Sequence, residues 1–410
     1  MSYPVSSANK DIIAKKSVVD YKKSHHRRRI LMELYRSDTR SIAEMARAIH
    51  NSVPSVTSIM EELMAEKWIV TTGTATTKQG RKPAVFSLSD ERFRTAVIDL
   101  NTHGTTFLVL NLKNEILFQR TCDLRLNDSP DILHRLTQSI ESCIAESGTN
   151  TADLVAMGVS MAGLVDSKKG FNFTYRNLNR GEQSLMNYLN EYFKIPVFGI
   201  NDTRATTLGE QRFGLAKGKN HVLAIYIDWG VGLGVILNGE IFQGSSGFAG
   251  ELGHIQVVPN GELCHCGKVG CLDTIASAES LAKRVSKALA EGRVSRLSTA
   301  DPAATDAEKI IEAAWQGDLL AIDVLHDMGM ELGKGLSIAI HLFNPEIVIV
   351  DGIVAKAGTF ITNPIEQAIN KFCLTDFRSH LKVEISQLGV KAKWLGTQVF
   401  TVEKLIESVQ

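Results

Sequence analysis

The 410-residue sequence predicts an α/β protein in which an N-terminal winged helix-turn-helix precedes a duplicated, actin-like or ribonuclease-H-like fold of two lobes. Three observations support this prediction. Helical apolar stripes recur before residue 65, two alternating strands joined by a basic hairpin follow, and one strand-turn-strand-turn-strand pattern occurs twice in the rest of the chain. We expect domains at 1–90, 91–200 and 201–392, with the C-terminal helix 393–410 completing the first lobe.

The composition is that of a globular chain with an uneven distribution of charge. Residues 1–90 carry 15 lysines and arginines against 9 aspartates and glutamates, whereas the remaining residues carry 30 against 36. A basic module joined to an acidic body favours nucleic-acid binding by the module, although a solvated face is the simpler alternative. The sequence has no secretory signal and no apolar run of about 18 residues, so we expect a cytoplasmic protein without membrane insertion.

The first ninety residues contain three short helical patterns and two strands. An apolar stripe at 30–35 marks the first helix, and the capping box Ser41-Ile42-Ala43-Glu44 starts the second. Pro54 fits the first turn of the third helix, where its missing N–H costs nothing. Alternating residues at 68–72 and 84–88 predict the two strands of a wing.

Short hydroxyl residues on the third helix and cations at the wing tip are the candidate DNA contacts. Hydroxyl side chains at the start of a recognition helix permit close approach to phosphates and base edges. A slender cationic wing tip fits a minor groove, and the cations of 22–29 are candidates for the phosphate backbone. The candidates are Ser55, Thr57, Ser58, Lys78, Arg81 and Lys82. A winged helix that docks another protein is the alternative.

The chain after the first ninety residues shows the same pattern of strands and turns twice. Residues 95–120 and 221–244 both read as strand, turn, strand, turn, strand, and each opens a stretch of further strands and helices. In a two-lobe fold of this kind, the first turn of each lobe faces the cleft between the lobes, which is the default ligand site.

Three cysteines crowd a short segment of the second lobe. Cys264, Cys266 and Cys271 lie within eight residues, and the chain lacks a secretory signal, so the cluster favours a metal over a disulfide. A group of reduced thiols is the alternative.

Motifs in the body resemble the ROK family of repressors, open-reading-frame products and sugar kinases. They are VAMGVSMAGLVD at 155–166, INDTRATTLGE at 200–210 and GFAGELGHIQVVPNGELCHCGKVGCLD at 247–273. The resemblance covers residues 25–405 and implies a sugar-kinase fold, to which the repressors of the family add an N-terminal winged helix.

The resemblance implies two sites in the body. His254, Cys264, Cys266 and Cys271 are assigned to one structural Zn²⁺, and three thiolates with an imidazole would leave no position open for catalysis. His265 is expected to point away from these ligands. The implied sugar-binding residues are Asn201, Asp202, Glu251, His254 and Asp273. A helix cap is the alternative for Asn201 and Asp202, and Asp273 stands where the family usually has glutamate, which leaves the sugar unidentified.

The turns that hold nucleotide phosphates in the family's kinases are altered here. The stretch 99–103 lacks both glycines and the lysine, Asp228 and Trp229 stand in the second turn, and 351–353 lacks a glycine run. These changes predict a regulator without catalytic residues, in which Asp202 is a vestigial base.

We therefore expect a sugar-responsive repressor of carbohydrate genes that binds double-stranded operator DNA. The expected effector is a sugar or sugar phosphate, and the expected assembly is a homodimer or a dimer of dimers. The alternatives are an active sugar kinase that carries a DNA-binding domain and a repressor relieved by a sugar-transport protein.

Overall fold

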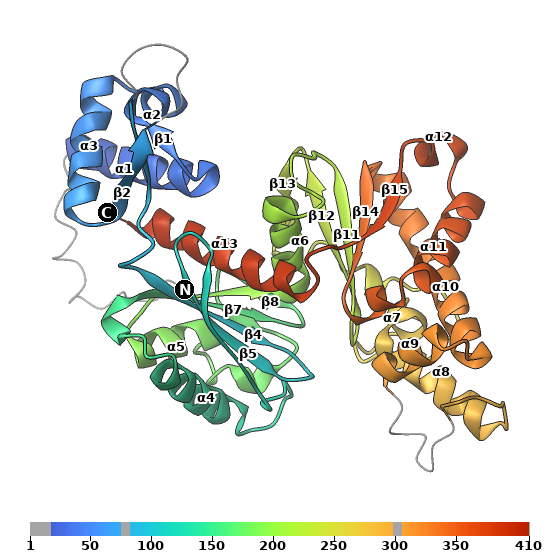
Figure 1. Ribbon diagram of the computed structural model, residues 1–410. Helices are drawn as coiled ribbons and strands as arrows, with labels where there is room; N and C mark the ends of the chain where they lie inside the picture. Colours follow the sequence, from blue (N-terminus) through green and yellow to red (C-terminus); the bar gives the residue numbers. More distant parts are fainter. Residues whose placement is uncertain (1–17, 75–82, 298–305, 410) are drawn as a thin grey trace, which may run out of the picture.

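The computed structural model describes residues 18–74, 83–297 and 306–409, which form a small N-terminal module and two larger lobes (Figure 1). The module lies beside the first lobe, and a long C-terminal helix crosses the molecule between the parts. None of the described helices combines the length and the apolar character that a membrane span requires.

The N-terminal module has the predicted three helices and two wing strands. Ser41 and Glu44 form the predicted capping box, and Pro54 lies in the first turn of the third helix. A short strand before the second helix pairs with the wing, so the sheet has the order β1-β3-β2. The elements are α1 (Val18–Ser37), β1 (Arg40–Ser41), α2 (Ile42–Ala48), α3 (Val53–Ala65), β2 (Ile69–Thr74) and β3 (Ala84–Leu88).

The first lobe is built on a five-stranded sheet of order β10-β7-β4-β5-β6. The strands β4, β5 and β6 form an antiparallel meander, and β7 and β10 add to β4 in parallel. Helices α4 and α5 pack against one face of this sheet. The strands are β4 (Arg94–Leu100), β5 (Thr105–Asn111), β6 (Ile116–Cys122), β7 (Leu154–Met161) and β10 (Val197–Asn201); the helices are α4 (Ile132–Glu146) and α5 (Leu185–Phe193). Short elements β8 (Val165–Asp166), β9 (Phe171–Asn172), η2 (Thr151–Asp153) and η3 (Arg176–Leu178) complete it.

The second lobe repeats this arrangement with the sheet order β13-β12-β11-β14-β15. Again three antiparallel strands are followed by two parallel ones, which confirms the predicted two-lobe fold. The strands are β11 (Val222–Ile227), β12 (Val231–Leu237), β13 (Glu240–Ile241), β14 (Ile347–Asp351) and β15 (Lys382–Ile385). The helices are η4 (Leu252–His254), α7 (Asp273–Ala276), α8 (Ala278–Ala290), α9 (Ala307–Trp315), α10 (Leu319–Phe343), η6 (Ile353–Ala357), α11 (Thr359–Phe372) and α12 (Thr375–Arg378).

Two helices, α6 (Asp202–Phe213) and α13 (Val390–Ser408), lie together between the sheets. Their backbones meet at two glycines: a Cβ at Gly396 would lie 1.7 Å from the Ala205 carbonyl oxygen, and a Cβ at Gly209 would lie 1.9 Å from that of Ala392. Because no side chain fits at either position, the two helices pack with their backbones in contact.

The C-terminal helix α13 joins the first lobe to the N-terminal module. Its start packs on β4 and β5 through Trp394, and its end enters the apolar core of the module through Val402 and Ile406. Polar contacts add to this: Arg36 pairs with Glu403 at 3.0 Å. The C-terminus therefore lies against the module (Figure 1).

A buried ion pair lies where the lobes meet α13. Lys393 Nζ is 2.9 Å from Asp99 Oδ1 at the end of β4, and the two side chains are 3% and 1% exposed. Asp99 Oδ2 accepts a hydrogen bond from Trp394 Nε1 at 3.1 Å, and Lys393 Nζ donates to the Tyr226 hydroxyl of the second lobe at 3.3 Å. One lysine thus contacts both lobes.

The substitution Lys393→Met should destabilise the protein strongly, because it leaves Asp99 buried without its counter-charge. We expect the free energy of unfolding to fall by about 3–5 kcal/mol. Urea unfolding followed by circular dichroism measures this. The exposed neighbour Lys391→Met is the matched control and should change the free energy by less than about 0.5 kcal/mol. Equal stability of the two variants would contradict a central role for the pair.

Candidate functional site

The third helix of the module presents only part of the predicted hydroxyl surface. Ser58 is exposed, whereas Ser55 and Thr57 are partly buried. Asn51 Nδ2 donates to Ser55 Oγ at 3.3 Å, and Thr57 Oγ1 donates to the Val53 carbonyl at 2.9 Å. The other predicted DNA contacts, Lys78, Arg81 and Lys82, lie outside the described residues.

Some cations of 22–29 are used inside the protein. Arg27 is buried, and its guanidinium donates to both carboxylate oxygens of Glu66, the C-cap of α3. Arg28 Nε donates to the Val409 carbonyl at 2.8 Å. The prediction that this segment faces the phosphate backbone is therefore wrong for Arg27, whose buried side chain joins α1 to the end of α3, and it stays a prediction for the partly exposed Arg28.

Four side chains of the second lobe form a compact donor cluster. His254, Cys264, Cys266 and Cys271 each offer one donor atom, and these atoms all lie within 4.8 Å of one another. Cys266 Sγ is 3.6 Å from Cys271 Sγ, and Cys264 Sγ is 3.7 Å from His254 Nδ1. All three cysteines are free thiols.

The donor set suits a tetrahedral ion. Donors at the usual zinc–sulfur and zinc–nitrogen distances lie about 3.6–3.8 Å apart along a tetrahedron's edges, close to the separations here. The left-handed glycines Gly267 (φ +85°) and Gly270 (φ +74°) turn the chain so that Cys266 and Cys271 meet. We conclude that this cluster can bind a metal ion.

His265 departs from the prediction that it points away from the cluster. Its side chain is largely exposed, but its Nδ1 lies 3.8 Å from Cys264 Sγ and 3.6 Å from Asp273 Oδ2. Its ring also packs edge-on against that of His254. His265 is thus a neighbour of the donor cluster, and it belongs to a second group of possible ligands with His254, Cys264 and Asp273.

Asn201 and Asp202 lie where β10 passes into α6. Asn201 Oδ1 accepts from the Arg204 amide at 3.1 Å, which makes Asn201 the helix N-cap, and its Nδ2 donates to the Gly163 carbonyl at 3.1 Å. The helix-cap alternative is therefore correct for Asn201. Asp202 Oδ1 accepts from the Thr203 amide at 2.7 Å. Burial raises the pKa of Asp202, although the charge of Lys393 opposes that change.

The carboxylates of Glu251 and Asp273 lie near that of Asp202. Burial, followed by the charges of Asp202 and Asp273, raises the pKa of Glu251 to about 7. Asp273 Oδ1 accepts from the Val231 amide at 2.6 Å, which fixes the turn between β11 and β12, and burial raises the pKa of Asp273. The structure thus brings the predicted sugar-binding residues Asp202 and Asp273 close enough to Glu251 to raise its pKa. A carboxyl with a pKa of about 7, as in Glu251, can both donate a hydrogen bond to a hydroxyl group and accept one from it.

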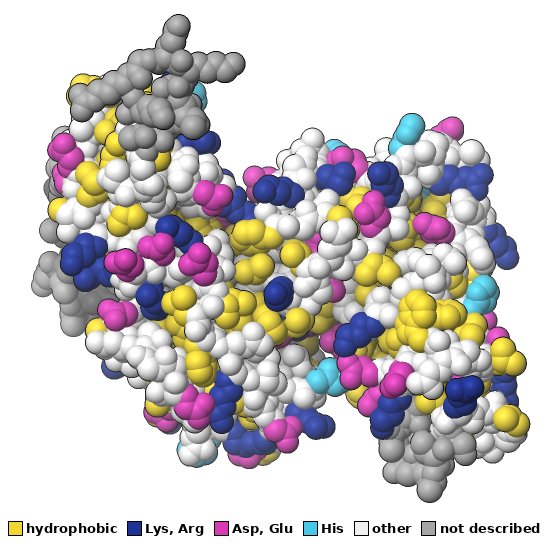
Figure 2. Space-filling model, in the orientation of Figure 1, with side chains coloured by type: hydrophobic (Ala, Val, Ile, Leu, Met, Phe, Trp, Pro, Cys, Tyr) yellow, Lys and Arg dark blue, Asp and Glu magenta, His cyan; other side chains and the backbone are white. Residues whose placement is uncertain are grey.

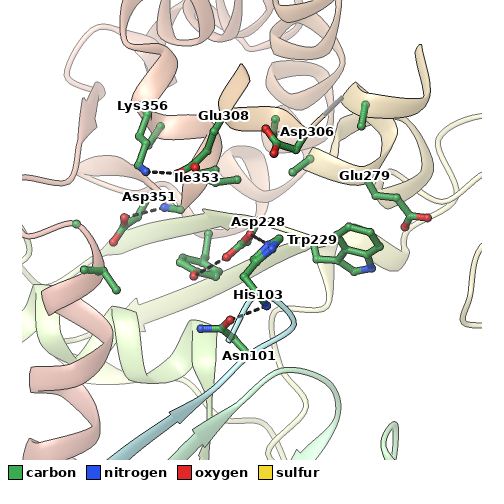
Figure 3. Close-up of a pocket in the computed structure, with 18 of the residues that line it drawn as sticks. Asn101, His103, Asp228, Trp229, Glu279, Asp306, Glu308, Asp351, Ile353 and Lys356 are labelled. Carbon is green, nitrogen blue, oxygen red and sulfur yellow. Dashed lines mark hydrogen bonds and ion pairs between the residues drawn. The ribbon is translucent and has the colours of Figure 1, made fainter. Parts of the chain in front are cut away.

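A cavity of about 1000 Å³ opens at the junction between the lobes (Figure 3). Its walls come from the β4–β5 turn, the β11–β12 turn, α8, the start of α9, η6 and the start of α13. Its lining includes Asn101, His103, Asp228, Trp229, Asp351 and Ile353, from the three stretches predicted to correspond to kinase phosphate turns. None of the described residues that line it is one of the five predicted sugar-binding residues.

The two turns at the mouth of this cavity are joined by an ion pair that the sequence did not reveal. His103 Nε2 from the first lobe lies 3.1 Å from Asp228 Oδ1 of the second, and Asp228 Oδ2 accepts from the Tyr226 hydroxyl at 3.1 Å. The hydrogen bond to Asp228 raises the pKa of His103. Burial of the Asp228 carboxyl acts to raise its pKa. The hydrogen bonds from His103 and Tyr226 and the charge of Lys393 act in the other direction and outweigh burial, so the pKa of Asp228 is lowered.

A second groove, of about 370 Å³, lies where the N-terminal module meets α6 and α13. The molecule is visibly hollowed between the module and the second lobe (Figure 2). Along this groove, Arg212 at the end of α6 donates to the backbone carbonyls of Tyr35 and Arg36, and the Arg36 bond measures 2.7 Å. These are the last carbonyls of α1, which a helix leaves without internal partners. Sequence reasoning missed this contact.

The comparisons with known proteins all point to the same family. A family model described as ROK family matches residues 95–403. The DNA-binding transcriptional dual regulator NagC of Escherichia coli (strain K12) is 32% identical over 334 residues, 82% of this chain and 82% of that protein.

Two solved structures extend the comparison. A ROK family transcriptional regulator, a homolog of the E. coli MLC protein, has a TM-score of 0.80 at 29% identity and covers 94% of this chain and 97% of its own. A ROK family glucokinase from Streptomyces griseus, in complex with glucose and AMPPNP, has a TM-score of 0.66 at 27% identity and covers 76% and 99%. The glucokinase thus leaves about a quarter of this chain unmatched, whereas the regulator spans nearly all of it.

Replacing one cluster thiol should remove the metal. Cys266→Ser takes away one of four donors, so we expect it to retain less than about a tenth of the metal bound by the wild type after dialysis against a weak chelator. Elemental analysis of the purified full-length protein measures this. Cys122→Ser, a thiol outside the cluster, should keep full metal content. Equal metal in all three proteins, or none in the wild type, would contradict the assignment.

Proposed function

The chain belongs to the ROK family, and from that premise we propose that it is a sugar-responsive transcriptional regulator. It binds double-stranded operator DNA through its winged helix-turn-helix and releases that DNA when a sugar or sugar phosphate occupies the cleft between the lobes. The observation that carries this proposal is the contact of α6 with both regions: Asn201 and Asp202 start the helix, and Arg212 at its end holds α1 of the module.

The DNA contacts are assigned to α3 and the wing. Ser58 is exposed near the start of α3, where the recognition helix of a helix-turn-helix enters the major groove, and Ser55 and Thr57 lie beside it. The sequence adds Lys78, Arg81 and Lys82 on the wing as phosphate or minor-groove contacts. Similarity to DNA-binding regulators over most of the chain supports this assignment.

The sugar is assigned to the cluster of carboxylates beside the metal centre. Asp202, Glu251 and Asp273 offer acceptors for sugar hydroxyls, with Asn201 and His254 at their side. We assign the metal as a structural Zn²⁺ held by His254, Cys264, Cys266 and Cys271, since a closed set of four donors suits a scaffold rather than a reactive centre. When bound, the ion would fix the positions of Glu251 and Asp273, which lie on either side of its ligands in the chain.

The signal passes along α6. From Asp202 to Arg212 this helix rises by about 15 Å. The backbone contact at Gly209 and Gly396 ties α6 to α13, which itself enters the core of the module. A change in lobe position at the sugar is therefore transmitted to α1 through two packed helices. By linkage, the sugar must bind the DNA-incompetent state more tightly, with a coupling free energy of about 1–3 kcal/mol.

A homodimer would place two recognition helices on two half-sites, and a shift of α1 in each subunit would change their spacing.

Kinase activity is disfavoured because Asp228 and the His103 side chain occupy the turns that would hold phosphate. The relatives above that span most of this chain are regulators, in keeping with this assignment.

Release of DNA by one sugar is the first test. A DNA fragment selected by the full-length protein from a random pool is titrated with glucose, xylose, N-acetylglucosamine and their phosphates. One of them should release the DNA, and Asp202→Asn should weaken that response at least tenfold without changing DNA affinity. The remote exposed substitution Asp376→Asn should respond like the wild type.

Sugar-dependent ADP formation that Asp202→Asn abolishes would establish the kinase alternative. Neither release nor a thermal shift with any sugar would refute the sugar-responsive proposal and favour control by a transport protein.

The route through α6 has its own test. Arg212→Gln removes the bonds to the α1 carbonyls, so sugar affinity should stay within about twofold while the sugar concentration needed for half-release of DNA rises at least fivefold. Calorimetry and the DNA-release titration measure the two quantities. The matched control is Lys217→Gln, an exposed cation just beyond α6. Normal release by Arg212→Gln would remove this contact from the signalling route.

A further inference from the structure

The second groove, where the N-terminal module meets α6 and α13, has a buried cation in its lining. Arg204, in the first turn of α6, lines this groove and is 6% exposed. Arg212, which contacts the module, lies two turns later on the same helix, about 12 Å further along its axis. The end of the groove that lies away from the module is therefore lined by a guanidinium almost entirely removed from bulk water.

Arg204 has no counter-charge among the residues that the structure describes. It forms no ion pair with any of them, and the only hydrogen bond of its guanidinium to them runs from Nη1 to Ser167 Oγ at 3.4 Å. Its Nε is buried without a hydrogen-bond partner. Burial lowers the pKa of Arg204, but a guanidinium remains protonated at neutral pH. Because a buried charge is costly unless an opposite charge compensates it, this position favours an anion supplied from outside the chain.

The charges around the groove favour a ligand with a single negative charge. Its described lining holds four cations and three carboxylates, namely Arg36, Arg204, Arg212, Lys404, Glu240, Glu403 and Glu407. Arg36 pairs with Glu403 at 3.0 Å, and Lys404 pairs with Glu407 at 2.6 Å. The lining thus carries one net positive charge, which a carboxylate neutralises and a doubly charged phosphate ester exceeds.

Apolar side chains form another part of the groove's walls. Leu208 lies one helical turn after Arg204 on the same face of α6, and α13 contributes Val399 and Phe400. The volume of about 370 Å³ limits the ligand to a small molecule. A planar carboxylate can accept two parallel hydrogen bonds from a guanidinium, while an apolar body gains contacts with the walls.

We propose that the second groove binds a small organic monocarboxylate with an apolar body, whose carboxylate accepts hydrogen bonds from the Arg204 guanidinium. None of the described residues that line the groove is one of the five predicted sugar-binding residues. The ligand is therefore distinct from the sugar, and the site goes beyond the proposed function instead of resting on it. An acid bound there would lie along α6 and α13, the two helices assigned to the signalling route.

Probes of similar shape and different charge test this site. Isovalerate is compared with its neutral amide, isovaleramide, and with the doubly charged isobutyl phosphate, on full-length protein that carries isotope-labelled arginine and no sugar. The Nε–H resonance of Arg204 is assigned in the NMR spectrum by its absence from Arg204→Gln. Isovalerate should shift this resonance saturably at millimolar concentrations, and it should bind at least about tenfold more tightly than either of the other probes.

Substitutions separate the charge of Arg204 from its place in the fold. Arg204→Gln removes the charge and keeps a group that can donate a hydrogen bond, so calorimetry should show isovalerate affinity reduced at least about tenfold. Because the substitution removes a buried charge without a counter-charge, the variant should unfold at the same urea concentration as the wild type or at a higher one. Arg125→Gln makes the same chemical change at a remote, exposed position and should bind isovalerate like the wild type.

Four results would overturn the proposal. They are an Arg204 resonance that isovalerate does not shift, binding of isovaleramide as tight as that of isovalerate, unchanged isovalerate affinity in Arg204→Gln, and clearly easier urea unfolding of that variant. Tighter binding of isobutyl phosphate would overturn the carboxylate class and assign the groove to a phosphate ester. The sugar-release titration does not involve Arg204, so each of these failures is distinguishable from a failure of the proposed function.

Discussion

The ion pair between Asp99 and Lys393 is the interaction on which the arrangement of the lobes depends. It lies at the end of the first strand of one lobe and the start of α13, and the lysine also reaches Tyr226 of the other lobe. Two opposite charges buried this deeply are stable only together, which restricts how far α13 can move relative to β4 without exposing one of them. Asp202, one of the proposed sugar-binding residues, lies close enough to Lys393 to be affected by its charge, Lys393 itself lines the cavity, and α13 continues into the core of the N-terminal module.

Helices α6 and α13 connect the junction of the lobes to the distant N-terminal module. Helices α6 and α13 meet at Gly209 and Gly396 with no side chain between their backbones, so they have little freedom to slide separately. Helix α6 begins after its N-cap Asn201 and contacts α1 at its end; α13 begins at Val390 and ends inside the core of the module. A ligand that changes the angle between the lobes therefore acts on the module through two helices at once.

Much of this could be predicted from sequence because it depends on local chemistry. The capping box at Ser41, Pro54 in the first turn of α3 and the repeated strand-turn-strand-turn-strand pattern of both meanders follow from neighbouring residues, and the structure has each of them. The cysteine spacing likewise anticipated one cluster. Contacts between segments far apart in the chain could not be foreseen: Arg27 pairs with Glu66, and His103 pairs with Asp228 of the other lobe.

The central claim is that sugar and DNA are coupled through the same two helices, and coupling of this kind is reciprocal. The most direct measurement is the affinity of the full-length protein for its sugar, by calorimetry, with and without saturating operator DNA. The account predicts that operator DNA weakens sugar binding by about 5- to 150-fold, which is the factor that corresponds to 1–3 kcal/mol. An identical sugar affinity in both conditions would contradict it, however tightly each ligand binds alone.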